Sequence, residues 1–124
     1  MNTKNTLYLL LLAAVCTLGA ARPQAISDMP CKIYVPNVFS PNNDGINDTF
    51  QPALNCPVST YDFKVFTRWG QQVFATQDSE IGWDGDINGR PAAAGVYIYT
   101  LKVSYESEEG ANEEIKTGDV SLIR

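Results

Sequence analysis

The sequence predicts an all-β protein, an immunoglobulin-like antiparallel β-sandwich of about seven strands that follows a cleaved signal peptide. Three observations support this fold class. Apolar and polar residues alternate with a period of two in several stretches, as at Tyr61, Phe63 and Val65. Asn, Asp, Gly and Pro residues, which favour turns, separate these stretches at short intervals. Helical spacing of apolar residues is convincing nowhere in the chain.

Residues 1–21 differ in kind from the rest of the chain. Lys4 provides a positively charged start, residues 7–18 form an apolar run, and residues 19–21 are the small residues that signal peptidase accepts. The apolar run is shorter than the roughly 20 residues of a membrane-spanning helix. We therefore predict a secretory signal peptide and an exported chain.

The end of the signal peptide leaves two alternatives open. Cleavage as late as residue 25 is one, and lipidation at Cys16 is the other, although Val15 before the cysteine argues against it. Residues 22–30 are predicted to be a short linker. Residues 31–124 are predicted to be one domain, since about 100 residues support one modest hydrophobic core.

Composition argues against several classes of function. The formal net charge is −5, Lys4 is the only charged residue of the predicted signal peptide, and the chain contains no histidine. An acidic surface without a basic stripe argues against nucleic acid as a partner. Without histidine, Ser-His-Asp catalysis and histidine-ligated metals are unavailable. Carboxylates such as Asp84 and Asp86 are turn residues that are usually solvated, so we predict no enzyme and no small-molecule substrate.

Cys31 and Cys56 remain as an even pair once the signal peptide is removed. In an exported chain, such a pair predicts a disulfide. Closing the loop between them would contribute about 3.5 kcal/mol to stability in the chain-entropy estimate. Two buried free thiols are the alternative, and two cysteines without histidine make a poor zinc site.

Strands are predicted at both ends of the domain and in its centre. The first covers residues 33–39. Residues 96–105 are apolar or aromatic on both faces, as expected of a central strand. Residues 115–123 form the last strand, with Val120 and Leu122 on one face.

A β-hairpin is predicted between the strand at residues 61–65 and its continuation at residues 73–74. Gly70 can adopt the positive φ that the reversal requires. Trp69 is expected to pack over the end of the hairpin as a structural corner. The alternative is that Arg68 and Trp69 form a knob that binds a partner, because both residue types are common in binding hot spots.

The segment at residues 36–50 combines prolines, Asn and Asp side chains and one glycine, which predicts a rigid loop bonded to itself. The sharper alternative is a weak Ca²⁺ site, because these oxygen ligands surround a glycine as in the first half of a calcium loop. A bidentate Glu is missing at the twelfth position, so we expect weak binding at best and no other cofactor. The residues in question are Asn42, Asp44, Gly45, Asn47 and Asp48.

Five motifs in this order resemble one family, the gliding-motility-associated C-terminal domain, a type B sorting domain of the type IX secretion system. The similarity covers nearly all of residues 31–124. Two small departures, Asn43 in place of Gly and Thr67 in place of Asn, leave the turn chemistry intact. The motifs are Val-Pro-Asn-Val-Phe-Ser-Pro-Asn-Asn-Asp-Gly-Ile-Asn-Asp at residues 35–48, Arg68-Trp69-Gly70, Gly82-Trp83-Asp84-Gly85, Asn88-Gly89 and Gly95-Val96-Tyr97.

The resemblance implies a domain that is recognised by outer-membrane components of the type IX machinery and exported through the periplasm to the cell surface or the medium. Members usually follow a large cargo, whereas here the domain is expected to stand nearly alone. We predict that the recognised surface comprises the loop at residues 42–48, Arg68 with Trp69, and the last strand from residue 116. The residues singled out in that strand are Val120, Leu122 and Arg124; those of the structural motif are Trp83, Asp84, Gly85, Gly95 and Tyr97.

The alternative function is an adhesin-like module that binds a carbohydrate or protein at the cell surface. It is suggested by Trp69, Trp83 and Tyr97, which would form an aromatic platform if they were exposed on one face of the sandwich.

Overall fold

The computed structural model describes residues 31–124, and the predictions for the signal peptide, the linker and Cys16 lie outside the described residues. The described part is all-β, as predicted, and none of its segments is a helix long and apolar enough to span a membrane. Its strands are β1 (Ile33–Tyr34), β2 (Val38–Phe39), β3 (Ala53–Leu54), β4 (Thr60–Thr67), β5 (Gln72–Thr76), β6 (Asp86–Ile87), β7 (Arg90–Pro91), β8 (Gly95–Ser107) and β9 (Gly110–Leu122).

The large sheet has the strand order β2-β9-β8-β4-β5. β8 and β9 pair antiparallel without a register shift over their whole length, and β4 pairs antiparallel with both β8 and β5. The run β9-β8-β4-β5 corresponds to the G-F-C-C′ sheet of variable-type immunoglobulin sandwiches. The immunoglobulin-like prediction therefore holds for the sheet that carries most of the chain.

The first predicted strand is two strands in different layers. β1 pairs with β3, whereas β2 pairs in parallel with the end of β9, Val38 opposite Ser121 and Phe39 opposite Leu122. Pro36 lies between them and cannot donate a backbone hydrogen bond, which interrupts the strand where the chain changes layers. Such short pieces raise the number of strands among residues 31–124 from the predicted seven or so to nine.

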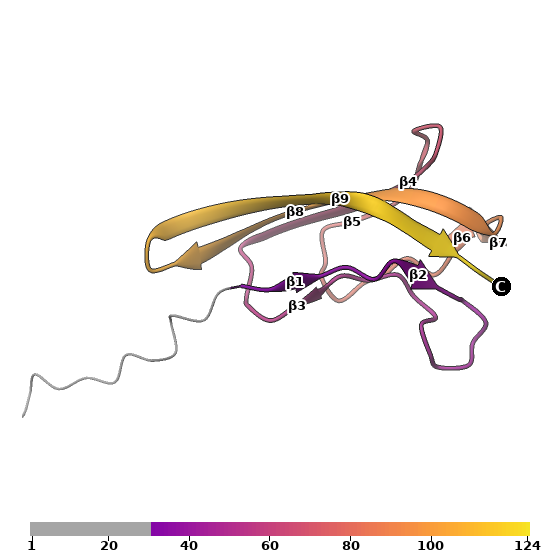
Figure 1. Ribbon diagram of the computed structural model, residues 1–124, viewed down its shortest axis with the longest axis horizontal. Coiled ribbons are helices and arrows are strands. Elements are labelled where there is room, and N and C mark those ends of the chain that lie inside the picture. The colour runs from indigo at the N-terminus through magenta and orange to yellow at the C-terminus, as the bar shows by residue number, and fades with distance from the viewer. Residues whose placement is uncertain (1–30) are drawn as a thin grey trace, which may run out of the picture.

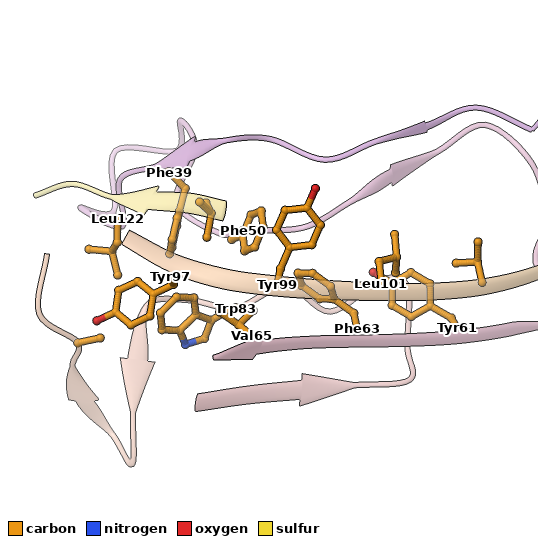
Figure 2. Close-up of a cluster of buried hydrophobic side chains, with 13 residues drawn as sticks. Phe39, Phe50, Tyr61, Phe63, Val65, Trp83, Tyr97, Tyr99, Leu101 and Leu122 are labelled. Carbon is orange, nitrogen blue, oxygen red and sulfur yellow. The ribbon is translucent and has the colours of Figure 1, made fainter. Parts of the chain in front are cut away.

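The core lies between the large sheet and the layer that contains β1 and β3 (Figure 1). Figure 2 shows an aromatic cluster there, in which Phe39, Phe50 and Tyr99 come from three different parts of the chain. The ring centroids of Phe39 and Phe50 are 5.7 Å apart and those of Phe50 and Tyr99 are 5.6 Å apart. Contacts at this distance add to the burial energy of the rings and fix their relative positions.

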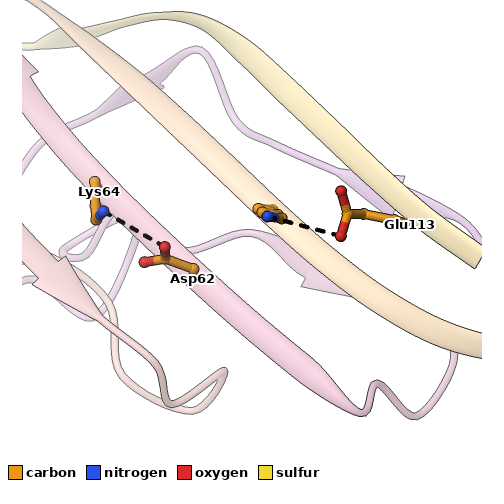
Figure 3. Close-up of polar contacts among 4 residues, drawn as sticks. Asp62, Lys64 and Glu113 are labelled. Atoms are coloured by element: carbon orange, nitrogen blue, oxygen red, sulfur yellow. Dashed lines mark ion pairs between the residues drawn. The ribbon is translucent and has the colours of Figure 1, made fainter.

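β8 lies inside the large sheet between β9 and β4, so the prediction of a central strand is confirmed, although only its inner face is buried. Its inward residues are buried, including Leu101 and Val103, whereas Val96 and Ile98 are 36% and 37% exposed. Two ion pairs lie on the outer face, Lys64–Asp62 at 3.5 Å and Lys102–Glu113 at 3.7 Å (Figure 3), and exposed pairs of this kind contribute little stability.

The predicted disulfide joins Cys31 and Cys56, with a Cα–Cα distance of 5.2 Å. Next to it, the Asn55 side chain accepts a hydrogen bond from the Lys32 N–H at 2.6 Å, and the Asn55 N–H donates to the Lys32 carbonyl at 3.2 Å. β1 and β3 share only two residue pairs. The covalent bond therefore holds together a ladder that is too short to be stable by itself.

Tyr61 gives the fold a predictable response to alkaline pH. Its hydroxyl is buried without a hydrogen-bond partner among the described residues, and burial, followed by the negative charge of Asp78, raises the pKa of Tyr61 to about 12. In the unfolded chain the phenol ionises near 10. Above that pH the unfolded state releases a proton that the folded state retains, so stability falls as the pH rises from about 10 to about 12.

We expect Tyr61→Phe to equal or exceed the wild type in unfolding free energy at pH 7, because it removes an unpaired buried hydroxyl. Urea titrations at pH 7 and at pH 11 test this. The variant should lose less stability between the two pH values than the wild type. A large loss of stability in Tyr61→Phe at pH 7 would show that the hydroxyl has a partner.

Candidate recognition surface

The loop at residues 40–48 is held by its own side chains. Asp48 is its centre: one carboxylate oxygen accepts the N–H groups of Asn42 at 3.2 Å and Asn43 at 3.0 Å, and the other accepts the N–H of Gly45 at 2.7 Å. Asp44 accepts the N–H of Ile46 at 2.8 Å. The loop is therefore a rigid, self-bonded turn, as the first interpretation of the sequence predicts.

The same hydrogen bonds weaken the calcium interpretation. Both oxygens of the Asp48 carboxylate already face backbone donors, and Asn42 uses its side-chain oxygen for the N–H of Asp44 at 3.2 Å. Asn47 contributes its backbone carbonyl, which accepts the Ser40 N–H at 2.8 Å, and its φ is 53°. Within residues 31–124, no group of three or more His, Cys, Asp or Glu side chains is arranged to hold a metal ion.

The turn between β4 and β5 is equally well fixed. The Thr67 N–H donates to the Gln71 carbonyl at 2.8 Å, and the Gly70 N–H donates to the Thr67 carbonyl at 2.9 Å. The Thr67 hydroxyl oxygen also accepts the Gln71 N–H at 3.1 Å. Gly70 has φ +89°, which only glycine adopts at low cost, so the predicted role of this glycine is confirmed.

Trp69 projects from this turn and is 92% exposed. The expectation that it packs over the end of the hairpin is wrong. The turn is closed by backbone hydrogen bonds and by Thr67, so the indole has no structural task there. Arg68 lies beside it in the same turn. The alternative interpretation, a knob that contacts a partner, is the one that this geometry fits.

Trp83 is the opposite case, with 1% exposure. Its indole N–H donates to the Asp86 carbonyl at 3.0 Å, and its ring centroid lies 5.4 Å from that of Phe39 and 5.0 Å from that of Tyr97. Tyr97 is buried as well and donates its hydroxyl to the Ala93 carbonyl at 2.7 Å. Two of the three aromatic residues that suggested a glycan platform therefore belong to the core, and the binding-module alternative is not favoured.

The Asp84-Gly85 turn connects this core to the end of the chain. The Asp84 carboxylate accepts the Asp86 N–H at 2.9 Å. Gly85 has φ +82°, and a Cβ on it would lie 2.8 Å from Cγ of Pro41. A side chain is thus excluded at this position both by the backbone conformation and by the neighbouring loop. Gly95, with φ +150°, marks the start of β8.

The last strand is part of the same unit. Val120 and Leu122 are each 1% exposed and pack in the core. Arg124 donates from its guanidinium to the Ala92 carbonyl at 3.0 Å and to the Gly85 carbonyl at 3.1 Å. These contacts give the three residues a role in the fold, and their predicted part in recognition stays a prediction. The sequence offered no indication of the Arg124 contacts, since their acceptors are backbone carbonyls.

The sequence motifs converge on one end of the molecule. In Figure 1 the loop at residues 40–48, the β4–β5 turn, the β6–β7 hairpin and the C-terminus all lie toward the right-hand end of the long axis, and the β8–β9 turn lies at the opposite end. The β4–β5 turn projects above the large sheet, and the loop at residues 40–48 lies below it. Loops clustered at one end of a sandwich are the usual place for binding surfaces in this architecture.

Comparison with known proteins identifies the family. The family described as "CHU_C Type IX secretion signal domain" matches residues 33–122. The chain belongs to this family. The match extends from the first residue of β1 to the last residue of β9. The predicted resemblance to a type IX sorting domain is confirmed.

One solved structure resembles this CHU_C domain. It is PorZ of Porphyromonas gingivalis, described as an essential bacterial surface component of the type IX secretion system. The two share 16% sequence identity with a TM-score of 0.43 over 86% of this chain, which spans 13% of the PorZ chain. No curated protein matches the sequence.

As a CHU_C domain, the chain is a sorting signal for type IX secretion and interacts with that machinery during export. A sorting signal needs a stable shape that another protein recognises. The described residues provide such a shape in the two hydrogen-bonded turns at one end of the sandwich.

Proposed function

We propose that outer-membrane components of the type IX machinery recognise the folded domain through the end of the sandwich that carries the β4–β5 turn and the loop at residues 40–48. The observation that carries this proposal is the 92% exposure of Trp69 on a turn fixed by its own hydrogen bonds. Tryptophan and arginine are among the residues most enriched in binding hot spots. A turn that is already rigid loses little entropy when it binds, which leaves more of the contact energy as affinity.

The loop at residues 40–48 lies at the same end of the sandwich but on the other side of the large sheet from the β4–β5 turn (Figure 1), and it offers a second contact. Its internal hydrogen bonds to Asp48 and Asp44 hold the backbone in one conformation, and Ile46 stands out from it with 66% exposure. Exposed apolar residues on two rigid loops at one end of a sandwich suit a partner with complementary pockets.

The route of the chain follows from this proposal. It crosses the inner membrane by its predicted signal peptide, folds in the periplasm with the Cys31–Cys56 disulfide, and reaches the cell surface or the medium as a folded domain. Catalysis has no part in the proposal, because the sequence contains no histidine and both cysteines of the described residues form the disulfide.

The proposed surface is tested with a fluorescent reporter placed between the signal peptide and residues 26–124, expressed in a host with a working type IX system. We expect Trp69→Ala to reduce protease-accessible reporter at the surface at least about tenfold, because a hot-spot tryptophan is worth about 2 kcal/mol or more. The melting temperature should stay unchanged, since the side chain is exposed.

Tyr34→Ala is the matched control. Tyr34 is also an exposed aromatic residue, at 67%, but it lies on β1, away from the end that carries Trp69. The control should be exported like the wild type. Equal export of the wild type, Trp69→Ala and Tyr34→Ala would show that Trp69 is not part of the recognised surface.

A further inference from the structure

β9 has a long edge that no described strand covers. It pairs with β8 from Gly110 to Leu122, but on its other side β2 reaches only Ser121 and Leu122. Residues 110–119 therefore have a neighbour on one side alone among residues 31–124. Natural proteins cover or disrupt such edges, because exposed backbone groups there pair readily with another strand.

The backbone groups that point to this edge can be identified. The N–H groups of Ser121 and Ile123 donate toward β2, to the carbonyls of Asn37 and Phe39. In a regular strand the backbone N–H and C=O groups of every second residue point to the same edge, and the β8–β9 register has no shift that would interrupt this alternation. The N–H and C=O groups at the free edge therefore belong to Ala111, Glu113, Ile115, Thr117 and Asp119.

Two opposite charges lie at equal distances from Ile115 along the strand, Glu114 on one side and Lys116 on the other. Ile115 is 62% exposed and points to the outer face of the sheet, since the inward positions of β9 are those of Val120 and Leu122. Glu114 and Lys116 flank it on the inner face, where they line a groove of about 650 Å³ shared with β1 and β3 and are partly shielded from water.

We propose that two copies of this chain associate through their β9 edges, antiparallel and centred on Ile115. Each Glu114 then lies opposite Lys116 of the second copy, and Ile115 meets Ile115 of the second copy. Glu114 and Lys116 do not point their backbone groups at the partner, and at such positions opposing strands approach most closely, with Cα atoms about 4.5 Å apart. The result is a contact with two ion pairs, one apolar pair and a continuous sheet, on a two-fold axis.

Neighbouring registers, with the axis at residues 113, 114, 116 or 117, are disfavoured by charge or by β2. The backbone groups of odd-numbered residues point to the free edge in both copies, so an odd-numbered residue must lie opposite an odd-numbered one. The two-fold axis therefore passes through a residue and not between two residues. An axis at Glu113, Glu114 or Lys116 places that charged side chain opposite its own copy, which is destabilising. An axis at Thr117 places Ile115 opposite Asp119 and brings the second strand onto Ser121, which β2 occupies. In the proposed register Glu113 faces Thr117 and keeps its own ion pair with Lys102 (Figure 3).

Charge reversal gives a direct test by sedimentation velocity on the full chain at concentrations up to about 1 mM, where weak complexes are populated. The wild type should show a reversible monomer–dimer equilibrium. Glu114→Lys and Lys116→Glu each turn two attractive pairs into two repulsive ones, so each should weaken dimerisation at least about tenfold. An equimolar mixture of these two variants should associate again, because one carries two positive charges where the other carries two negative ones.

Glu80→Lys is the matched control for Glu114→Lys, since it makes the same change in net charge at an exposed residue between β5 and β6, outside β9. It should dimerise like the wild type. A wild type that is monomeric at every concentration would overturn the proposal. Dimers that survive either single reversal, or a mixture that fails to associate, would overturn it as well, because association would then use another surface.

Cysteine cross-linking tests the register. Ile115→Cys places two thiols on the proposed axis, at a Cα separation of about 5.5 Å that a disulfide can bridge. Glu113→Cys places them two residues from the axis on opposite sides. Mild oxidation should give a covalent dimer of Ile115→Cys and little of Glu113→Cys. The reverse ranking would contradict the register.

Discussion

Trp83→Ala is expected to lower the free energy of unfolding by about 3–5 kcal/mol, the usual cost of removing a large buried aromatic side chain. The indole contacts Phe39 and Tyr97, and its N–H is bonded to the Asp86 carbonyl. Residues 50 and 83 also form an isolated β-bridge, so the backbone around the indole joins two parts of the chain that the large sheet does not connect. A small domain has a net stability of about 5–15 kcal/mol, so this loss leaves a marginal fold.

Trp69→Ala provides the matched comparison, because it makes the same chemical truncation at an exposed site. In urea unfolding followed by circular dichroism, Trp69→Ala should unfold at the same midpoint urea concentration as the wild type. Trp83→Ala should unfold at a much lower urea concentration. Equal destabilisation by the two substitutions would contradict the assignment of one tryptophan to the core and the other to the surface.

The second large effect is expected from the disulfide. Replacing Cys31 and Cys56 by serine should cost about 3.5 kcal/mol, the chain-entropy estimate for a loop with a sequence separation of 25. The layer formed by β1 and β3 should loosen first, because its ladder has only two residue pairs. Hydrogen exchange of the amides in β1 and β3 should therefore accelerate more than exchange in β8.

Reductant supplies the control for this prediction. Dithiothreitol should lower the melting temperature of the wild type to that of the serine variant and leave the serine variant unchanged. A serine variant as stable as the untreated wild type would show that non-covalent contacts alone hold the β1–β3 layer.

β4 and β8 could be predicted from the sequence because each has enough residues to display the alternation of apolar and polar positions, whereas β9, predicted at residues 115–123, begins at Gly110. The alternation at Tyr61, Phe63 and Val65 locates β4, and that of residues 96–105 locates β8. The turn at Gly70 follows from local chemistry, since a reversal with positive φ needs glycine. The disulfide follows from cysteine parity in an exported chain.

The short strands could not be predicted in the same way. Strands of two residues have no measurable period, and the parallel pairing of β2 with β9 joins residues far apart in the chain. The covering of only one face of β8 is also a tertiary property, because it depends on how much chain is left to form a second layer.

The two tryptophans show the limit for the candidate site. Trp69 and Trp83 both precede or lie near a glycine turn, and composition does not distinguish them. The two tryptophans differ in burial because of the tertiary structure. Phe39 and Tyr97, which belong to distant strands, pack against Trp83, whereas the β4–β5 turn is closed by backbone hydrogen bonds that do not involve the indole of Trp69. The contacts of Arg124 with the carbonyls of Gly85 and Ala92 depend on the same tertiary arrangement.

The most direct test of the account is delivery of the reporter fused to residues 26–124 in two hosts that differ only in a working type IX secretion system. The account predicts protease-accessible reporter at the surface of the competent host and periplasmic reporter in the other, with the domain folded in both. Folded domain and reporter retained in the periplasm of both hosts would contradict the conclusion that this chain is a sorting signal for type IX secretion.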